Sequence, residues 1–197
     1  RNIAIGNTAY DASDTESDNL AIGYAAMTTN TAGGSNNVAI GNYTLDALTS
    51  ADNCVAIGYN SMTTNTTGIQ NIGVGTQTLR DNTTGQENVA MGHNALLANT
   101  TGNANIAIGQ AALDANTTGT RNIAIGMNAY TGSDTESDNL AIGYSAMTTN
   151  TAGGTKNVAI GNYAGDAITS GDKNTAVGYD AGTAIRSGNN NNCFGKL

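Results

Sequence analysis

The sequence predicts an all-β fold, a β-solenoid of about eleven 17-residue rungs, from three observations. A glycine closes the segment Asn105-Ile106-Ala107-Ile108-Gly109, and this segment recurs along the whole chain at intervals of 17 or 18 residues. Large apolar and small residues alternate before each of these glycines, which is typical of a short strand. A glycine in every repeat, together with many Asn and Thr residues, disfavours helix. Because one such repeat cannot bury its own apolar face, successive repeats are expected to stack as rungs.

Positions within a rung are counted here from the repeat glycine, so that Ile106 lies at −3 and Ile108 at −1. Side chains alternate along a strand, so this Ile pair points to one face and Ala107, at −2, to the other. We expect the Ile pair and a further apolar residue at +4 to lie inside the coil. The face formed by Asn105, Ala107 and Gly109 is then flat and open to another chain. In the Asn-Thr-Thr-Gly segment that follows, we expect glycine at positive φ and Asn as a local cap.

A longer period is superimposed on the rungs, so that 1–120 and 121–197 are related by a 120-residue super-repeat within one solenoid, 1–197. After this shift, 41 of the 52 residues in 1–52 and 121–172 are identical. The chain opens inside a rung, so we interpret it as a segment of a longer fibre. Gly165 and Gly182 replace the apolar +4 residue in the late rungs, and an Asn run follows at 189–192, which indicates either a weaker coil there or a transition to the next element.

The apolar content of a rung predicts association. Each rung buries about three large side chains, worth roughly 1.5–3 kcal/mol each, whereas ordering each residue costs about 1–2 kcal/mol for the backbone alone. A lone coil is therefore marginal, and we expect several chains to pack along the alanine face as a homotrimer. The alanines predicted at this interface are Ala4, Ala21, Ala39, Ala56, Ala90, Ala107, Ala124, Ala141, Ala159 and Ala176.

Composition and charge exclude several classes of function. A net charge of −8 with seven Lys and Arg residues disfavours nucleic-acid binding. No apolar run approaches the ~20 residues of a membrane span. No constellation of side chains supports catalysis, so we expect no enzyme activity, no cofactor and no metal. Cys54 and Cys193 lie eight rungs apart, or about 38 Å at ~4.8 Å per rung, which excludes a disulfide between them and predicts buried free thiols.

Four tyrosines follow the repeat glycine directly, and they are the candidate ligand-contacting residues. They could form an aromatic surface that stacks on glycans, or they could cover the groove between chains. These residues are Tyr24, Tyr59, Tyr144 and Tyr179.

Two weaker candidates concern metal binding. Three copies of His93 near the axis of a trimer could bind a metal ion, although a surface or packed histidine is favoured. Asp14, Glu16 and Asp18 alternate in an acidic loop that recurs at 133–138. Such a loop could hold Ca²⁺ weakly, although a solvated loop is favoured because Ca²⁺ needs six to eight oxygen ligands.

Stacked threonine pairs raise an alternative from another class. Thr83-Thr84, Thr100-Thr101 and Thr117-Thr118 would form a ladder over consecutive rungs, similar to the ice-binding faces of β-solenoids. Adjacent threonines in a strand would point to opposite faces, which argues against this alternative.

The segment Asn157-Val158-Ala159-Ile160-Gly161 resembles the head repeats of trimeric autotransporter adhesins, and 116–126 is similar to repeats of phage and cyanophage tail fibres. The resemblance spans essentially the whole chain, although the rungs here are longer than those of the adhesin heads. It implies a left-handed β-roll that forms trimers around a central axis and serves in attachment. We therefore expect a segment of a trimeric attachment fibre, extracellular or on a virion, that contacts a cell-surface glycan or protein receptor. A purely structural extracellular filament and an ice-binding solenoid remain as alternatives.

Overall fold

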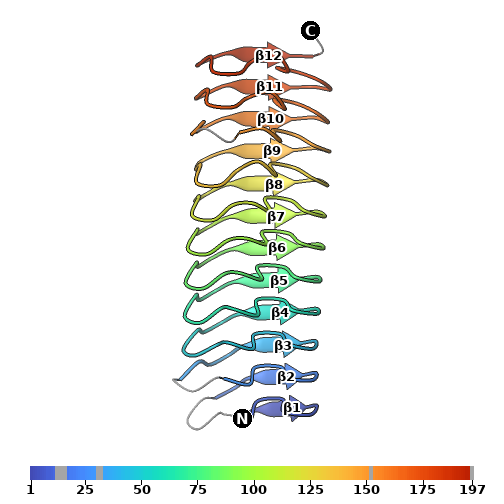
Figure 1. Cartoon of the computed structure of the whole chain (residues 1–197), viewed down its shortest axis with the longest axis vertical. Helices are drawn as coiled ribbons and strands as arrows, with labels where there is room; N and C mark the ends of the chain where they lie inside the picture. The colour runs from blue at the N-terminus through green and yellow to red at the C-terminus, as the bar shows by residue number, and fades with distance from the viewer. Residues whose placement is uncertain (12–16, 30–32, 151–152, 196–197) are drawn as a thin grey trace.

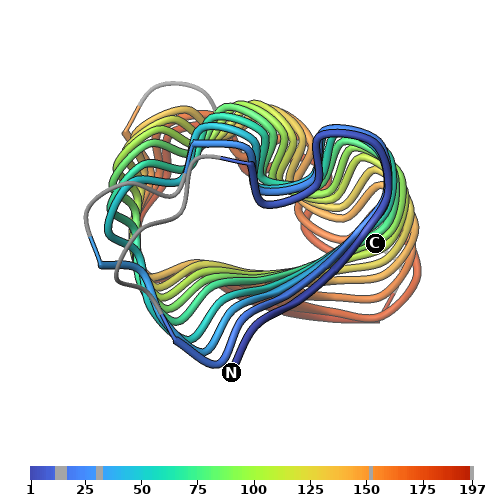
Figure 2. The same ribbon diagram turned by 90° about the horizontal axis from the view of Figure 1, so that it is seen from below.

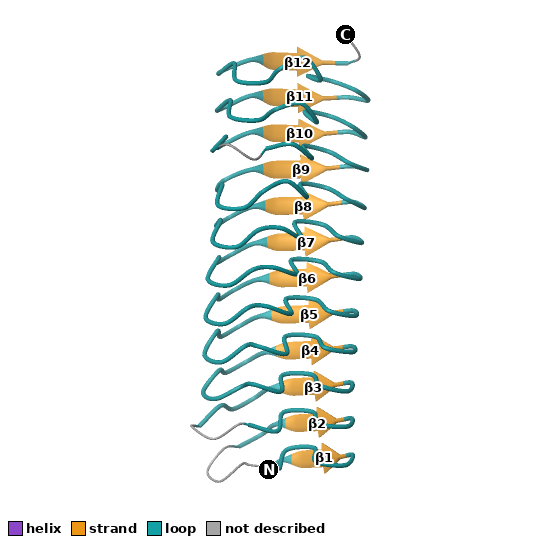
Figure 3. Ribbon diagram, in the orientation of Figure 1, coloured by secondary structure: helices purple, strands orange, loops and turns teal. Residues whose placement is uncertain are grey.

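The protein is a β-solenoid of about eleven turns, seen in a computed structural model that describes residues 1–11, 17–29, 33–150 and 153–195 (Figure 1). These residues form strands and turns and contain no helix (Figure 3). Twelve three-residue strands pair in chain order in one parallel sheet. The strands are β1 (Ile3–Ile5), β2 (Leu20–Ile22), β3 (Val38–Ile40), β4 (Val55–Ile57), β5 (Ile72–Val74), β6 (Val89–Met91), β7 (Ile106–Ile108), β8 (Ile123–Ile125), β9 (Leu140–Ile142), β10 (Val158–Ile160), β11 (Thr175–Val177) and β12 (Asn192–Phe194).

The register between strands follows the repeat, as the sequence predicts. In β7 and β8, Ile106 lies opposite Ile123, 17 residues later. The two 18-residue rungs keep the same alignment, since Leu20 of β2 lies opposite Val38 of β3. The additional residue is therefore accommodated in the loop and leaves the sheet in register. Seen along the coil axis, the rungs lie over one another and rotate gradually from one end to the other (Figure 2).

The two faces of the sheet are the reverse of the prediction. Ala107 is fully buried inside the coil, whereas Ile108 lies on the outer surface and is 37% exposed. Nine of the ten alanines proposed as contacts between chains are fully buried within their own coil, and the tenth, Ala4 in the first rung, is exposed. The proposal that this alanine face meets sister chains is therefore wrong.

The width of the coil explains the reversal. Gly73 occupies an alanine position, and a Cβ there would lie 2.8 Å from Ser61 Oγ and 3.1 Å from Met62 Cε. The interior thus has little room even for a methyl group at −2, and a leucine-sized side chain would overpack it. The general tendency of large apolar residues to be buried gives way here to the space available.

The apolar residue at +4 does lie inside, as predicted, and it is held in an unusual backbone. Leu113 is fully buried with φ 54°, and Ala111, two residues earlier, has φ 53°. Such left-handed conformations are uncommon for residues with a side chain. They are stabilised here because their N–H groups bond to neighbouring rungs on both sides: Ala111 donates to the carbonyl of His93 at 2.9 Å, and Leu113 to that of Ala129 at 3.0 Å.

The asparagine at −4, predicted on the outer face, is also buried. Asn105 Nδ2 donates to the carbonyl of Gly119 across the coil at 2.8 Å, and Asn105 Oδ1 accepts the N–H of Asn122 at 2.9 Å. Its own N–H donates to Asn88 Oδ1 at 3.0 Å. The same contacts recur from rung to rung and form what we call the first Asn ladder. Its members are Asn2, Asn19, Asn37, Asn71, Asn88, Asn105, Asn122, Asn139, Asn157, Asn174 and Asn191.

A second Asn ladder runs inside the coil at position +7, through Asn65, Asn82, Asn99 and Asn116. Each Nδ2 after the first donates to the Oδ1 of the preceding member at 2.7–2.9 Å. Each also closes its own turn by donating to the glycine carbonyl three residues later. The Asn of the Asn-Thr-Thr-Gly segment thus caps locally, as predicted, and in addition joins consecutive rungs.

Most rungs contain two glycines in fixed positions, the repeat glycine and a second glycine ten residues later. Gly109, the repeat glycine, has φ 131°, and a Cβ there would lie 2.5 Å from the carbonyl oxygen of Gly126. Gly102, in the Asn-Thr-Thr-Gly segment, does not have positive φ, so that prediction is wrong. A Cβ on Gly102 would instead lie 2.5 Å from the carbonyl oxygen of Gly119. The close stacking of rungs, rather than the turn conformation, therefore favours glycine in this segment, and Ala51 and Glu136 take the equivalent position in two other rungs.

Residues at +4 and +7 of one rung compensate each other in volume. Where Gly165 replaces the usual apolar residue, the fully buried Ile168 occupies the space, and a Cβ on Gly165 would lie 3.0 Å from its Cδ1. Conversely, the large Tyr130 is paired with the small Ser133. The interior therefore stays filled at Gly165, and the glycine substitution alone does not indicate a weakened coil.

Candidate functional surfaces

The outer sheet face runs along all twelve strands of the described coil. We define it as the side chains at −3 and −1 of β1–β12, and all of them are uncharged. Mid-coil members include Ile57, Ile72, Met91 and Ile108, which are 36%, 38%, 42% and 37% exposed. Twenty-two of these 24 side chains are large and apolar. If roughly a third of each is exposed, their exposed apolar surface is on the order of 1,000 Å². The largest exposed apolar patch of a typical monomer is about 300–600 Å².

The four candidate tyrosines belong to two clusters of three. Tyr43 lies between Tyr24 and Tyr59, with ring centroids 5.3 Å and 6.1 Å away and rings inclined at 85° and 83°. We call this group the first tyrosine triad. Its central residue occupies position +2, one place after the slot of the other two, and an inspection of the +1 column alone misses it.

The second tyrosine triad repeats the first after 120 residues. Tyr163 lies between Tyr144 and Tyr179, with centroid distances of 5.2 Å and 6.0 Å and inclinations of 86° and 89°. Burial, followed by the proximity of Tyr144, raises the pKa of the Tyr163 hydroxyl. The structure therefore brings the predicted residues together in pairs and adds a third tyrosine to each. Aligning the +1 and +2 columns of neighbouring rungs would have revealed both additions.

The acidic loop does not gather its carboxylates. Asp14 and Glu16 lie outside the described residues, but the second copy is described. Glu136 is almost fully buried, and its Oε2 accepts the N–H groups of Asp134 and Thr135 while its Oε1 accepts that of Gly153. Asp138 instead pairs with Arg121 at 2.6 Å, and the hydrogen bond from this guanidinium lowers the pKa of the carboxyl. These carboxylates point to separate partners.

The other residues singled out for metal or thiol chemistry are isolated from one another. His93 is exposed at the turn after β6, and no three His, Cys, Asp or Glu residues of the described chain form a metal-binding group. Both cysteines are free. Cys54 is buried in an Asn slot of the first ladder, and its Sγ donates to the carbonyl of Gly68 at 3.3 Å. Cys193 is only partly buried, so the expectation of two buried thiols holds for Cys54 alone.

The threonine pairs form two columns on the outer surface. Thr83 Oγ1 and Thr100 Oγ1 each donate to the threonine carbonyl of the next rung at 3.0 Å, which fixes the column at +8. The neighbouring column at +9, which includes Thr84 and Thr101, is exposed. Both columns lie in a bend rather than in a strand. The expectation that adjacent threonines in a strand point to opposite faces therefore does not apply to these pairs.

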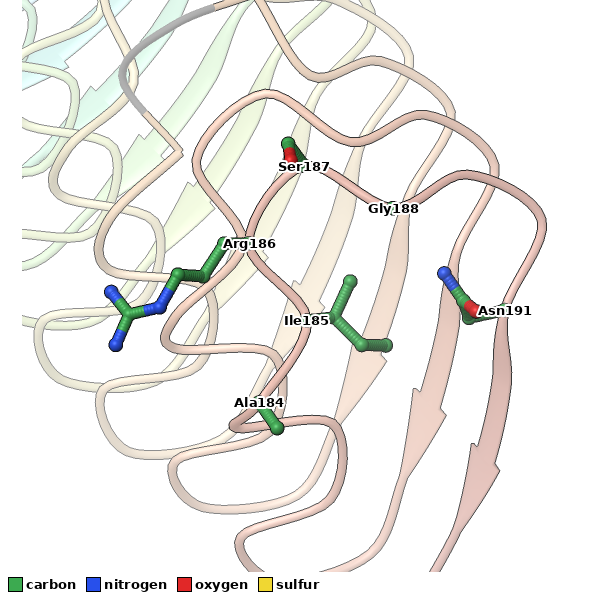
Figure 4. A pocket seen from close by; sticks show the side chains of 6 residues that line it. All are labelled: Ala184, Ile185, Arg186, Ser187, Gly188 and Asn191. Atoms are coloured by element: carbon green, nitrogen blue, oxygen red, sulfur yellow. The ribbon is translucent and has the colours of Figure 1, made fainter.

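A cavity of about 380 Å³ lies at the C-terminal rungs (Figure 4). It is lined by Ala184, Ile185, Arg186, Ser187, Gly188 and Asn191. Ile185 and Asn191 project toward the space inside the coil, whereas the Arg186 side chain points away from it. The cavity is thus the open end of the described interior, and its lining carries no cluster of reactive groups.

Comparison of the chain with protein-family models, curated proteins and solved structures finds no match. The described residues also include no helix that is long and apolar enough to cross a membrane. The surfaces described above are therefore the basis for any statement about function.

Proposed function

We propose that the chain is a segment of a homotrimeric attachment fibre, whose three coils pack their outer sheet faces against one another around a common axis. The observation that carries this proposal is the outer sheet face itself. It runs the length of the coil, it is uncharged, and its isoleucines and valines are only partly covered. Exposed apolar surface of this extent marks a site of association.

A second copy of the chain fits this face better than an unrelated partner does. The face has the 17-residue periodicity of the coil, so an identical, parallel coil offers the same spacing of side chains at every rung. At on the order of 1,000 Å² per chain, the face exceeds the ~800 Å² that each partner buries in a standard stable interface. Three coils would cover all three faces at one axis, and the resemblance to trimeric adhesin heads favours this number over two.

The proposed role is mechanical. Stacked rungs joined by strands and by two internal Asn ladders would hold exposed turns at a distance from an anchor. The location that fits such a segment is extracellular, at a cell surface or on a virion, and the partner is a glycan or protein receptor. A passive extracellular filament would have the same surfaces. An attachment fibre differs from it in that receptor-bearing cells would retain the protein.

The association is tested by molar mass. We expect light scattering after gel filtration to give three times the 19.8 kDa of one chain. The double variant I106D/I108D places two charges on the outer sheet face and should give monomers. The matched double variant T84D/T101D, on an exposed bend, should remain trimeric. A wild-type chain of one or two protomers would refute the trimer.

Loss of trimers in I106D/I108D could also reflect unfolding of the variant. A second measurement therefore uses a substitution that leaves the coil folded. We expect I108C, in a background with Cys193 replaced by Ala, to form covalent trimers with a short reagent that carries three thiol-reactive groups. T101C in the same background should give none. Equal cross-linking at both positions would contradict the assignment of the interface. Retention of labelled trimer on cells, compared with its retention after surface glycans and proteins are removed, then separates attachment from a passive filament.

Ice binding is a second candidate, and one observation favours it: the two threonine columns are regular, and side-chain hydrogen bonds along successive rungs hold the column at +8. Thermal hysteresis at millimolar protein is the measurement that decides it. A positive result that T84Y and T101Y abolish would support ice binding, whereas no hysteresis in the wild-type protein would remove this candidate.

A further inference from the structure

The two tyrosine triads are the most distinctive side-chain clusters outside the outer sheet face. In each, a central ring stands nearly perpendicular to the rings on either side, at centroid distances between 5.2 Å and 6.1 Å. The outer rings remain open to solvent: Tyr24 is 47%, Tyr59 49% and Tyr179 55% exposed. Aromatic surface is thus held in a fixed arrangement and left uncovered by the chain itself.

The backbone beneath each triad is the same and is fixed by hydrogen bonds. Asn42 Oδ1 accepts the N–H of Tyr24 at 2.9 Å, and the carbonyl of Tyr24 accepts the N–H of Tyr43 at 2.9 Å. The equivalent bonds in the second triad, at Tyr144 and Tyr163, have the same lengths. Because the platform is pre-organised, little conformational entropy is lost when a ligand binds to it.

The polar groups that act on the central tyrosines are the neighbouring hydroxyls and a carboxylate. Tyr24, Tyr59 and the carboxylate of Asp46 all contribute, after burial, to raising the pKa of the Tyr43 hydroxyl. Asp180 acts in the same way on Tyr163. Residues 2–79, which contain the whole first triad, include no Lys or Arg. The first triad therefore offers aromatic faces, hydroxyls and a carboxylate, and the rungs from Tyr24 to Tyr59 contain no Lys or Arg.

We propose that each tyrosine triad is a binding site for a neutral glycan. The apolar C–H face of a pyranose would stack on a tyrosine ring, and the sugar hydroxyls would bond to the tyrosine hydroxyls and to the carboxylate. Anionic glycans and nucleic acids are disfavoured because the carboxylate would repel their negative charge. This inference rests on the proposed attachment function, because it names the class of receptor.

The duplication gives each chain two such sites. Seven rungs separate the triads, which corresponds to about 34 Å at ~4.8 Å per rung. A long polysaccharide could contact both sites, and a trimer would present six. Linked sites of this kind raise the overall affinity by about 10²–10⁴-fold over that of one site when their spacing permits simultaneous contact. A triad alone is therefore expected to bind weakly, and the pair to retain a polymer.

The variants follow from the repeat. Position +2 holds Ala or Ser in rungs of the same backbone, at Ala25, Ala111 and Ser145, so Y43A and Y163A place a residue there that the rung already accepts. Q77A, at +2 between the triads, is the matched control. The chain contains no tryptophan, and six of its eight tyrosines belong to the triads, so tyrosine fluorescence reports mainly on them.

The test is titration of the full chain with neutral hexasaccharides of glucose, xylose and mannose, and with an oligogalacturonate as the anionic probe. We expect at least one neutral probe to bind and change tyrosine fluorescence, and Y43A/Y163A to weaken it at least tenfold. Q77A should bind as wild type, and the oligogalacturonate should not bind. On a neutral polysaccharide surface, Y43A alone should dissociate faster than wild type.

If no neutral probe binds, or if wild type and Y43A/Y163A bind equally well, the proposal is overturned. Molar mass separates this outcome from failure of the trimer. If Y43A/Y163A changes the molar mass, the triads are contacts between chains and the glycan site is refuted. If the chain binds glycan as a monomer, the trimer fails and the glycan site stands.

Discussion

Asn99→Ala should be among the most destabilising substitutions of a single small side chain in this coil. Asn99 is fully buried in the middle of the second Asn ladder. Its Nδ2 donates to Asn82 Oδ1 at 2.7 Å and to the carbonyl of Gly102 at 3.0 Å, and its Oδ1 accepts Asn116 Nδ2 at 2.9 Å. The substitution removes all three hydrogen bonds.

The magnitude follows from the partners that remain. Gly102 O still accepts from Asn88 Nδ2 at 2.9 Å, and Asn116 Nδ2 still donates to Gly119 O at 3.2 Å. Asn82 Oδ1 loses its donor and stays buried, which costs about 1–3 kcal/mol, and each of the other two lost bonds costs about 0.5–1.5 kcal/mol. We expect the free energy of unfolding to fall by about 3–4 kcal/mol.

Urea denaturation followed by circular dichroism measures the difference, at a fixed protein concentration because the proposed association would contribute to stability. Amide hydrogen exchange should show the loss concentrated in the neighbouring rungs, since contacts in a solenoid are local. Asn103→Ala is the matched control, because this exposed side chain makes one hydrogen bond, to the N–H of Gln86, which water can replace. A loss below about 1 kcal/mol for Asn99→Ala, or equal losses for both variants, would refute this account of the ladder.

Three further outcomes are expected. Gly109→Ala should prevent stacking of its rung, because φ is 131° and the new Cβ would lie 2.5 Å from Gly126 O. We expect expression to give no soluble, β-rich protein, and a normal melting temperature would contradict this prediction. Ser133→Asn alone should destabilise the coil by crowding Tyr130, whereas Tyr130→Leu with Ser133→Asn should recover most of the loss in a double-mutant cycle; additive effects would contradict the compensation. Burial raises the pKa of Cys54 from 9.0 to about 11, so the unfolded chain loses its thiol proton first, and the free energy of unfolding should fall by up to about 3 kcal/mol between pH 9 and pH 11. Cys54→Ala should remove that part of the pH dependence, and an identical profile for both proteins would contradict the assignment.

The sequence was sufficient for the architecture because the period itself encodes it. A glycine every 17 or 18 residues fixes the rung, and the alternation around Ala107 fixes the strand. Both were confirmed, including the 18-residue rungs and the buried residue at +4. The trimer and the attachment function remain proposals.

The direction of each face could not be read from the alternation. Period two separates Ile106 from Ala107, but it does not say which one faces inward. The decision depends on the interior width, which is set by the +4 residues and by two ladders of asparagine that are far apart in each repeat. The column of asparagines that includes Asn105 was predicted on the outer face. An asparagine in nearly every rung, directly before a strand, is more consistent with a buried ladder than with an open surface.

The candidate site was predicted in part. Tyr24 and Tyr59 were identified from their shared slot, but Tyr43 was missed because it lies one position later in the rung between them. Side chains at +1 and +2 become neighbours only when the turn after the glycine is built in three dimensions. The carboxylates of the second acidic loop show the converse, since residues that alternate in sequence point to different partners in space.

The uniform register of the sheet has a consequence at the level of the gene. Because every strand pairs with the next in the same way, a recombination event between the near-identical stretches 1–52 and 121–172 would add or remove 120 residues without introducing an unfamiliar junction. Each such event would change the length of the coil by seven rungs, about 34 Å at ~4.8 Å per rung, and would gain or lose one tyrosine triad. Length and valency would therefore evolve together, in whole steps.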